Sequence, residues 1–244
     1  MSSDGAKAPS TGPVPSRDRI VWVDCEMTGL DLERDALVEI AALVTDGELT
    51  VLGEGVDVVI RPPEESLAQM RDVVREMHTT SGLLDVLAEG TTVADAEEQV
   101  LAYVRRYVPD ARKAPLAGSS VGTDRGFIAR DMPLLEEHLH YRVVDVSSIK
   151  ELVRRWYPRV HFNAPAKHGG HRAMADILES IAELRFYREA VFVPLPGPDS
   201  DQVKAMAPAH EVPAGSVPAW APGLAAAHAA PTGEGSDPSS RTPA

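Results

Sequence analysis

Two carboxylates interrupt an apolar segment near the start of the chain. Residues 21–30 read VWVDCEMTGL, and Asp24 and Glu26 stand where a buried strand would continue its hydrophobic pattern. Because side chains alternate along a strand, the two acids share one face, about 6.6 Å apart along the strand. Like charges at this spacing repel each other and are costly to desolvate. A hard cation such as Mg²⁺ or Mn²⁺ would remove the conflict. The alternative is a strand end whose acids face water.

Two further acids and a histidine extend this candidate metal site. Asp124 lies in SSVGTDRGF at a helix start, and Asp176 lies in KHGGHRAMADI, five residues after His171. Taken singly, an aspartate at a helix start complements the helix dipole, and a lone histidine is commonly a loop or packing residue. Together, four carboxylates can hold two divalent cations about 4 Å apart for an in-line phosphoryl displacement. A neutral imidazole beside them can accept the proton of the attacking water.

An α/β fold must position these residues. Short connections between the first three strands predict an antiparallel meander, and strand–helix units follow it. Predicted strands cover residues 19–26, 36–46, 50–60, 114–120 and 141–146. Predicted helices cover residues 66–77, a segment from 92, then 124–138, 147–156 and 171–190. Capping boxes at Ser66 and Thr92, and a cap at Ser147 or Ser148, are expected to start three of them. This order indicates a mixed sheet with helices packed on it.

The composition indicates one globular domain between two low-complexity ends. The chain has 244 residues, of which 43% are hydrophobic and 25% charged, as is usual for a globular protein. Residues 1–17 and 194–244 are rich in Pro, Ala, Gly and Ser. Such segments cannot bury enough apolar surface to offset their chain entropy. We therefore expect disordered tails on either side of a domain over 18–193.

Charge and cysteine content narrow the possible functions. The net charge of −13 disfavours general binding to long nucleic acid but leaves room for a small, metal-neutralised site. The one cysteine, Cys25, cannot form an internal disulfide and fits a reducing compartment. With neither a membrane-length apolar stretch nor a signal-peptide pattern, the sequence favours a cytoplasmic protein without a membrane partner.

Three segments closely resemble the exonuclease motifs of the oligoribonuclease family, a branch of the DEDDh 3′→5′ exonucleases. They are VWVDCEMTGLD, GSSVGTDRGFIARDMPLLEEHLHYRVVDVSSIKEL and GGHRAMADILESIAELRFYRE, within a match from about residue 19 to about 191. The resemblance implies an RNase H-like mixed β-sheet, an antiparallel meander plus parallel strands, flanked by helices. It also implies a general base, His171, and two divalent cations (Mg²⁺ or Mn²⁺) held by Asp24, Glu26, Asp124 and Asp176.

The same resemblance implies a set of substrate-binding residues. Leu30 matches a leucine that wedges between the two bases of a dinucleotide, and His78 matches a substrate-proximal position. Tyr141 matches a tyrosine that each subunit of a homodimer supplies to its partner's site. Three residues match positions that cap the substrate's 5′ phosphate and would exclude longer chains sterically: Ser120, Arg142 and Ser147.

Several of these residues also have a purely structural explanation. Leu30 could belong to the core, Ser147 could be a helix cap, and Tyr141 could be an interface or core aromatic. Arg142 could form a surface salt bridge that contributes little. Without the resemblance, the structural explanation would be preferred for all four.

One position departs from the family pattern. Met70 and His78 are present, but Val73 stands where the family often has a tryptophan. An aromatic ring there would stack on a base, a contact of about 1–3 kcal/mol that valine cannot make. The departure bears on affinity and base preference rather than on hydrolysis. The 194–244 segment also has no counterpart in the family pattern.

The sequence thus favours a metal-dependent 3′→5′ exoribonuclease that degrades short RNA to 5′-mononucleotides. Its chief substrates would be dinucleotides, including linear di-GMP, and it would not act on long duplex nucleic acid. One alternative is a proofreading-type exonuclease of longer single-stranded DNA or RNA that uses the same acids without depending on Arg142 or Ser147. A second is a binding protein without turnover, which would be expected to lack one of the four acids or His171.

Overall fold

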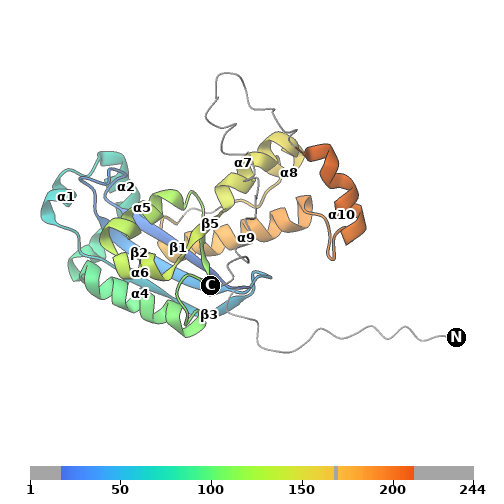
Figure 1. The fold of residues 1–244 in the computed structure, drawn as a ribbon. Coiled ribbons are helices and arrows are strands. Elements are labelled where there is room, and N and C mark those ends of the chain that lie inside the picture. Colours follow the sequence, from blue (N-terminus) through green and yellow to red (C-terminus); the bar gives the residue numbers. More distant parts are fainter. Residues whose placement is uncertain (1–17, 168–169, 212–244) are drawn as a thin grey trace, which may run out of the picture. The chain divides into compact units, whose positions relative to one another are not determined.

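A computed structural model describes residues 18–167 and 170–211 of the chain (Figure 1). The chain divides into two units, Met1–Phe192 and Val193–Ala244, and the candidate site residues all belong to the first. The tail predicted over 1–17 and most of the tail predicted over 194–244 lie outside the described residues.

The first unit is built on a five-stranded mixed sheet with the order β3-β2-β1-β4-β5. The strands are β1 (Ile20–Met27), β2 (Leu37–Thr45), β3 (Val51–Val59), β4 (Pro115–Gly118) and β5 (His140–Asp145). Strands β1, β2 and β3 form the antiparallel meander, and β4 and β5 run parallel to β1. The predicted mixed α/β sheet is therefore confirmed.

Helices cover both faces of this sheet (Figure 1). In the first unit they are α1 (Glu64–Ala68), α2 (Asp72–Thr80), α3 (Leu83–Val86), the 3₁₀ helix η2 (Leu87–Glu89), α4 (Val93–Tyr107), α5 (Gly122–Asp131), α6 (Pro133–His138), α7 (Val146–Trp156), α8 (Pro158–Phe162) and α9 (Ala173–Val191). One core layer lies between the sheet and α4, α5 and α6, and the other lies between the sheet and α7 and α9.

The side chains of the central strand β1 point alternately into the two core layers. Val21, Val23 and Cys25 belong to the core layer of α4–α6, whereas Trp22 is fully buried in the layer of α7 and α9. Because alternate side chains share a face, Asp24 and Glu26 continue the Trp22 face and lie on the side of α9. Each fully buried large side chain of these layers contributes about 1.5–3 kcal/mol of transfer free energy.

Several helix boundaries differ from the sequence prediction. The predicted helix from Ser66 to Met77 is two helices, and Ser66 lies inside α1, where its hydroxyl donates to the Arg34 carbonyl rather than capping. The predicted 124–138 helix is also two, because Pro133 starts α6 without a backbone N–H to continue the ladder of α5. Helix α9 begins at Ala173, two residues later than predicted.

The predicted helix caps have mixed outcomes. Thr92 caps α4 as expected, since its side chain accepts a hydrogen bond from the Asp95 N–H. Helix α7 is capped by Asp145, so the prediction of a cap at Ser147 or Ser148 was wrong. The second unit contains helix α10 (Ser200–Met206) and the 3₁₀ helix η3 (Ala207–His210), inside the segment predicted as a disordered tail. A capping box between Asp199 and Gln202 starts α10 and supplies its local stability.

Candidate active site

Four acids gather near the carboxyl ends of the parallel strands. Asp24 and Glu26 lie in β1, Asp124 lies in the first turn of α5 after β4, and Asp176 lies in the first turn of α9. Parallel strands β1 and β4 place their carboxyl ends at one edge of the sheet, where α/β proteins commonly bind ligands. The sheet topology therefore brings together acids up to 152 positions apart in the sequence, from Asp24 to Asp176.

Specific contacts join these acids and the predicted base. The Asp124 Oδ1 atom accepts a hydrogen bond of 2.9 Å from the Cys25 N–H, which ties α5 to β1 between the two strand acids. One nitrogen of His171 and one oxygen each of Glu26 and Asp176 all lie within 4.8 Å of one another. The structure thus brings the predicted acids and His171 to one site.

The acids destabilise one another's charged forms. Burial, followed by repulsion from Asp124 and Asp176, raises the pKa of Asp24 to about 9. Burial and then Asp176 raise the pKa of Glu26 to about 7. Burial also raises the pKa of Asp124 to about 6, opposed by the hydrogen bond from Cys25. The pKa values of these three carboxyls stay raised although Arg172 opposes the shift of Glu26, so the residues fit divalent cations, which prefer clustered carboxylate oxygens.

Asp176 is the least enclosed of the four acids. Burial and then repulsion from Glu179 raise the pKa of its carboxyl, whereas His171 and Lys167 oppose that shift. Asp176 is therefore the acid of this group that lies near both His171 and Lys167. Its carboxylate and the imidazole of His171 are close enough to act on one ligand.

A partly buried ion pair fixes the start of helix α9. Glu39 on β2 is fully buried and is the register partner of Glu26 on β1. Its carboxylate accepts hydrogen bonds from Arg172 Nε at 2.7 Å and from the Ala173 N–H at 2.9 Å. This anchor holds the residues immediately after His171 and sets the first turn that carries Asp176. Sequence reasoning missed Glu39, although a single acid inside the otherwise apolar run LVEIAALVT was a visible signal.

His78, which was predicted to lie near the substrate, is buried beside Glu26. Its side chain is fully buried, Nε2 lies 2.9 Å from the Met27 carbonyl, and Nδ1 lies 3.9 Å from Glu26 Oε2. A carbonyl oxygen can only accept, so Nε2 carries a proton and Nδ1 faces the carboxylate. The position places His78 behind Glu26 rather than at the surface of the site. The ring is fully buried next to an acid of the site, and the predicted part of His78 in substrate binding stays a prediction.

Leu30 projects from the loop that follows β1. Its side chain is 74% exposed, so the alternative of a core residue is wrong. A pocket of about 360 Å³ opens beside it, and its lining includes Arg34, Arg71 and Val74. Val73 on α2 is 62% exposed. Because the Leu30 side chain is exposed and lines the pocket, it is suited to contact an apolar ligand surface such as a base.

Two of the three predicted phosphate-capping residues lie together. The Ser120 hydroxyl donates to the Ser147 hydroxyl at 3.0 Å, and the Ser120 backbone has a positive φ of 56°. Arg142, on the edge strand β5, instead donates from Nε to the Tyr141 hydroxyl at 3.1 Å, and its guanidinium lies 5.5 Å from that ring. Tyr141 is 71% exposed. The structure joins Ser120 with Ser147 and Arg142 with Tyr141, and records no hydrogen bond between these two described pairs.

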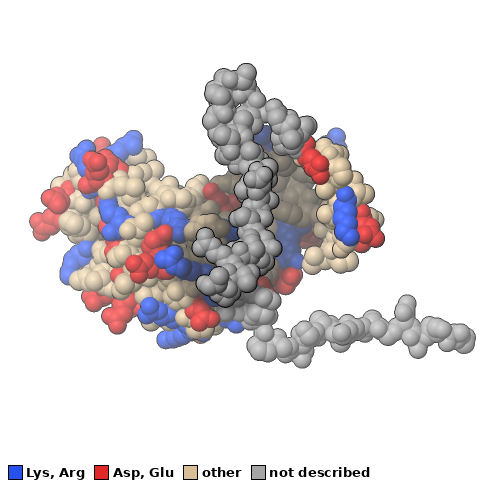
Figure 2. All heavy atoms as spheres, viewed as in Figure 1, with Lys and Arg blue, Asp and Glu red and all other residues tan. Residues whose placement is uncertain are grey.

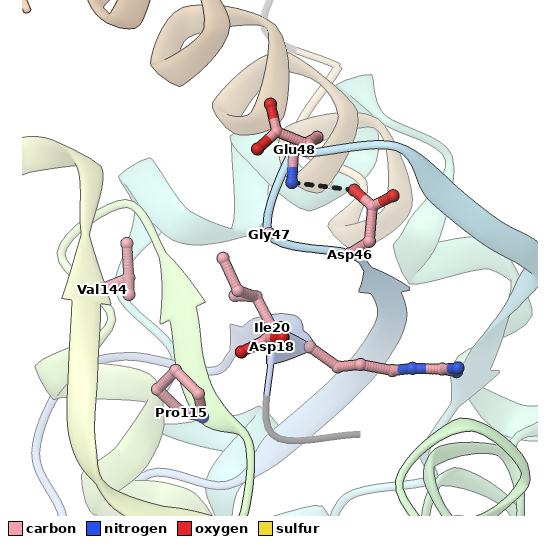
Figure 3. Close-up of a pocket in the computed structure, with 8 residues that line it drawn as sticks. Asp18, Ile20, Asp46, Gly47, Glu48, Pro115 and Val144 are labelled. Carbon is pink, nitrogen blue, oxygen red and sulfur yellow. Dashed lines mark hydrogen bonds between the residues drawn. The ribbon is translucent and has the colours of Figure 1, made fainter. Parts of the chain in front are cut away.

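A second hollow lies away from the acids. It has a volume of about 420 Å³ and is lined by residues that include Asp18, Ile20, Glu48 and Pro115, at the amino ends of β1 and β4 and the β2–β3 turn (Figure 3). Because β1 carries Asp24 and Glu26 toward its other end, this hollow does not include the candidate active site.

The visible surface carries charges of both signs. On the face of the first unit seen in Figure 2, Lys and Arg are interspersed with Asp and Glu and form no continuous basic stripe among the described residues. A protein that tracks long nucleic acid needs such a stripe. Within the described part of the chain, no helix is long and apolar enough to span a membrane.

Comparisons of sequence identify close relatives. Residues 21–184 match the family model described as Exonuclease. An oligoribonuclease from Streptomyces coelicolor is 71% identical over 198 residues, which are 81% of this chain and 99% of that protein. An oligoribonuclease from Cutibacterium acnes is 61% identical over 188 residues, 77% of this chain and 93% of that protein. The matched region contains every residue of the candidate site.

Comparisons of structure identify the same fold in more distant proteins. Escherichia coli exonuclease I in complex with a dA16 oligonucleotide matches with a TM-score of 0.56 and 16% sequence identity, over 70% of this chain and 41% of that one. A thermophilic exonuclease I from Methylocaldum szegediense matches with a TM-score of 0.50 and 19% identity, over 71% of this chain and 41% of that one. The chain thus spans about two fifths of the exonuclease I chains, and the likeness establishes the RNase H-like fold.

Proposed function

We propose that this chain, which belongs to the exonuclease family and within it to the oligoribonucleases, hydrolyses short oligoribonucleotides from the 3′ end. The observation that carries the proposal is the convergence of Glu26, Asp176 and His171 within 4.8 Å, beside Asp24 and Asp124. A phosphodiester hydrolase needs this combination of hard oxygen ligands and a proton acceptor.

The four carboxylates would hold two divalent cations, Mg²⁺ or Mn²⁺. Bound at this edge, the cations would neutralise the acids and polarise the scissile phosphate. The protein prepares their site by holding Asp24 and Glu26 on the rigid central strand and Asp124 against it through the Cys25 N–H. His78 lies beside Glu26, with its Nδ1 atom 3.9 Å from the carboxylate.

His171 is the proposed general base. It lies immediately before the anchored residue Arg172, and its backbone has a positive φ of 45°. This conformation is uncommon for a residue with a Cβ atom, so the turn that presents the imidazole is specific. The neutral ring would accept a proton from the water that attacks the phosphorus, and the products would be 5′-mononucleotides.

The preferred substrates are proposed to be dinucleotides, including linear di-GMP. Leu30 would separate the two bases, and Ser120, Ser147 and Arg142 would bind the 5′ phosphate. A closed 5′ end leaves no path for a longer chain, whereas an open groove would admit one. The paired serines support this assignment because the Ser147 hydroxyl, which accepts from Ser120, keeps its own proton to donate to a phosphate group.

The proposed assembly is a cytoplasmic homodimer in which Tyr141 reaches the partner's site. Tyr141 and Val143 are exposed on β5, which forms one edge of the sheet. An edge strand with exposed apolar side chains is a surface that proteins commonly cover. The dimer would therefore cover β5 and complete each site with an aromatic ring.

The direct test is hydrolysis of an RNA dinucleotide by the intact chain in Mn²⁺, in Mg²⁺ and with a chelator. The wild-type chain is expected to release mononucleotides only with a divalent cation. Asp176→Asn keeps the shape of the side chain, removes one charged ligand and should abolish turnover. Near-normal activity of this variant would contradict the assignment of the site.

A further inference from the structure

The loop from Thr28 to Ala36, here called the 28–36 loop, connects β1 to β2 and carries Leu30 at its exposed part. Its ends are joined by a backbone hydrogen bond from the Thr28 N–H to the Ala36 carbonyl, at 2.9 Å. The loop starts one residue after the strand that bears Asp24 and Glu26. Any movement of the loop would therefore move Leu30 relative to these acids.

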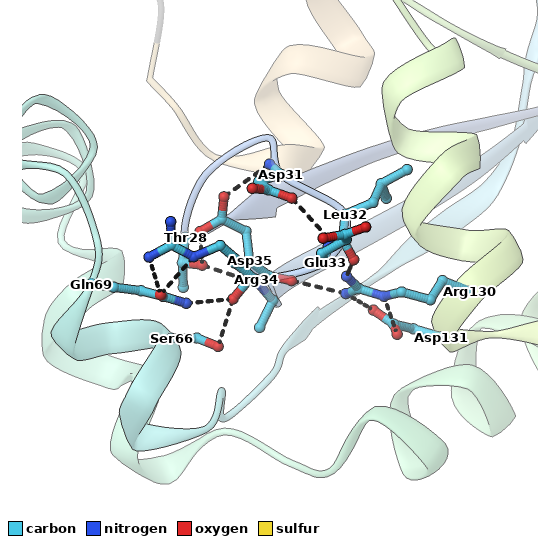
Figure 4. Close-up of polar contacts among 11 residues, drawn as sticks. Thr28, Asp31, Leu32, Glu33, Arg34, Asp35, Ser66, Gln69, Arg130 and Asp131 are labelled. Carbon is cyan, nitrogen blue, oxygen red and sulfur yellow. Dashed lines mark hydrogen bonds and ion pairs between the residues drawn. The ribbon is translucent and has the colours of Figure 1, made fainter.

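Asp35 organises the loop from inside. Its Oδ1 atom accepts a hydrogen bond from the Thr28 hydroxyl and its Oδ2 atom accepts one from the Asp31 N–H, each at 2.9 Å (Figure 4). The carboxylate lies so close to Gly29 that a Cβ atom on that residue would stand 2.3 Å from Asp35 Oδ2. Glycine is thus required beside Leu30 so that the loop can close over Asp35.

Arg130 holds the same loop from helix α5. Its guanidinium donates to the carbonyls of Leu32 and Asp35, the latter at 2.9 Å (Figure 4). Asp131 orients the guanidinium through two further hydrogen bonds of 2.7 and 2.6 Å. Leu32 also packs against Gly126 of α5, where an added Cβ atom would lie 3.3 Å from a Leu32 methyl.

The other side of the loop is held by α1 and by Gln69, the residue that follows it. The Arg34 carbonyl accepts hydrogen bonds from Gln69 Nε2 at 2.7 Å and from the Ser66 hydroxyl at 3.2 Å (Figure 4). The Arg34 guanidinium donates back to Gln69 Oε1. Side-chain contacts therefore fix the loop on both sides, while Leu30 itself remains exposed.

We propose that Arg130 and Asp35 are positioning residues that hold the 28–36 loop, fix the position of Leu30 and thereby favour hydrolysis of a substrate with two bases over a substrate with one. Helix α5 carries Asp124 six residues before Arg130, about 9 Å along one rigid helix. The same element thus positions an acid of the site and the loop that bears Leu30. This inference rests on the role of Leu30 in the proposed function.

The test compares a substrate with two bases and a substrate with one. The first is a 5′-phosphorylated RNA dinucleotide, and the second is the p-nitrophenyl ester of thymidine 5′-monophosphate. The ester has a single base, so Leu30 has no pair of bases to separate. Arg130→Met is expected to lower kcat/KM for the dinucleotide on the order of tenfold and to change ester hydrolysis by less than about twofold. If Arg130→Met folds poorly, Asp35→Asn replaces it, because it preserves the side-chain shape. The same loss on the dinucleotide and the same small change on the ester are expected.

Arg188→Met is the matched control. The Arg188 side chain is 35% exposed, against 33% for Arg130, and it also forms an ion pair with a carboxylate. Its partner, Glu48, lies in the β2–β3 turn, at the edge of the sheet away from the acids. This variant should leave the ratio of the two activities unchanged.

A double-mutant cycle distinguishes positioning from a general structural role. In a Leu30→Ala background, Arg130→Met should cause no further loss on the dinucleotide, because the residue that it positions is already absent. An equal loss on both substrates, or losses that multiply in the double variant, would overturn the inference. If Leu30→Ala alone left dinucleotide hydrolysis unchanged, the proposed wedge would fail and the inference with it.

Discussion

The hydroxyl groups of Ser120 and Ser147 lie 3.0 Å apart, although one follows β4 and the other lies in the first turn of α7. Asp145 holds them together, because its Oδ1 atom accepts hydrogen bonds of 2.9 Å from the backbone N–H groups of both serines. The cap of helix α7 therefore also fixes the loop after β4. A single carboxylate preorganises the proposed phosphate cap before any substrate binds.

Removing one of these hydroxyls should weaken recognition of the 5′ phosphate. Ser147→Ala is expected to lower kcat/KM on the order of tenfold for a 5′-phosphorylated dinucleotide, since one hydrogen bond to a charged group is lost. The same dinucleotide without its 5′ phosphate serves as the internal control and should be hydrolysed at an unchanged rate. Equal effects on both substrates would remove Ser147 from the phosphate cap.

His171→Ala should separate chemistry from binding. Loss of a general base is expected to lower kcat by a factor of about 10² to 10⁴. Because Ca²⁺ can occupy an oxygen site, dinucleotide affinity in Ca²⁺ should stay within a few-fold of that of the unmodified chain. If binding disappeared together with turnover, His171 would be a ligand or a structural residue instead.

The metal-free protein should become less stable as the pH rises. Burial raises the folded-state pKa of Asp24 from 3.8 to about 9 and that of Glu26 from 4.5 to about 7. Between those limits the folded state binds more protons than the unfolded state, so the free energy of unfolding falls with increasing pH. The melting temperature in chelator should drop between pH 5 and pH 9.

Added Mn²⁺ should reverse this trend. Since cations bind the deprotonated carboxylates, Mn²⁺ should raise the melting temperature more at pH 8 than at pH 5. Asp24→Asn is the informative variant, because it removes the most strongly shifted carboxyl and should flatten the pH dependence in chelator. A melting temperature that rose with pH in the metal-free protein would contradict the raised pKa values of Asp24 and Glu26.

Tyr141→Ala should impair a site that is completed across a dimer. Light scattering is expected to give twice the monomer mass for the unmodified chain, and the variant should lose activity on dinucleotides severalfold. Phe162→Ala changes another exposed aromatic residue and serves as the control. A monomer with full activity would refute the contribution of Tyr141 to a partner's site.

The mixed sheet was predicted well because alternation along strands and short connections between them are local patterns. Alternation in VWVDCEM placed Asp24 and Glu26 on one face, and the parallel strand β4 brought Asp124 to the same edge. The resemblance to a known family then assigned roles that spacing alone left open. The carboxylates and His171 could therefore be named before the structure.

Residues that act through tertiary contacts could not be predicted in this way. Glu39 binds Arg172 across 133 positions of the chain, and Arg130 reaches Asp35 across 95. The apolar run around Glu39 marks that acid, but no local signature identifies Arg172 as its partner or joins Arg130 to Asp35. Some helix starts were predicted wrongly for a related reason, because a polar side chain near a helix start has several possible hydrogen-bond partners. Asp145 rather than a serine caps α7, and Ser66 binds the Arg34 carbonyl rather than capping a helix.

A metal site that is closed at the 5′ end of the substrate would exclude long chains. It is tested most directly by hydrolysis of 5′-labelled RNAs of two, three and seven nucleotides, with Mn²⁺ and with chelator. We expect the dinucleotide to be cleaved far faster than the longer RNAs, and only with metal. Cleavage of the seven-nucleotide RNA at an equal or higher rate would contradict it, and would leave the acids in place while removing Ser120, Arg142 and Ser147 from a closed cap.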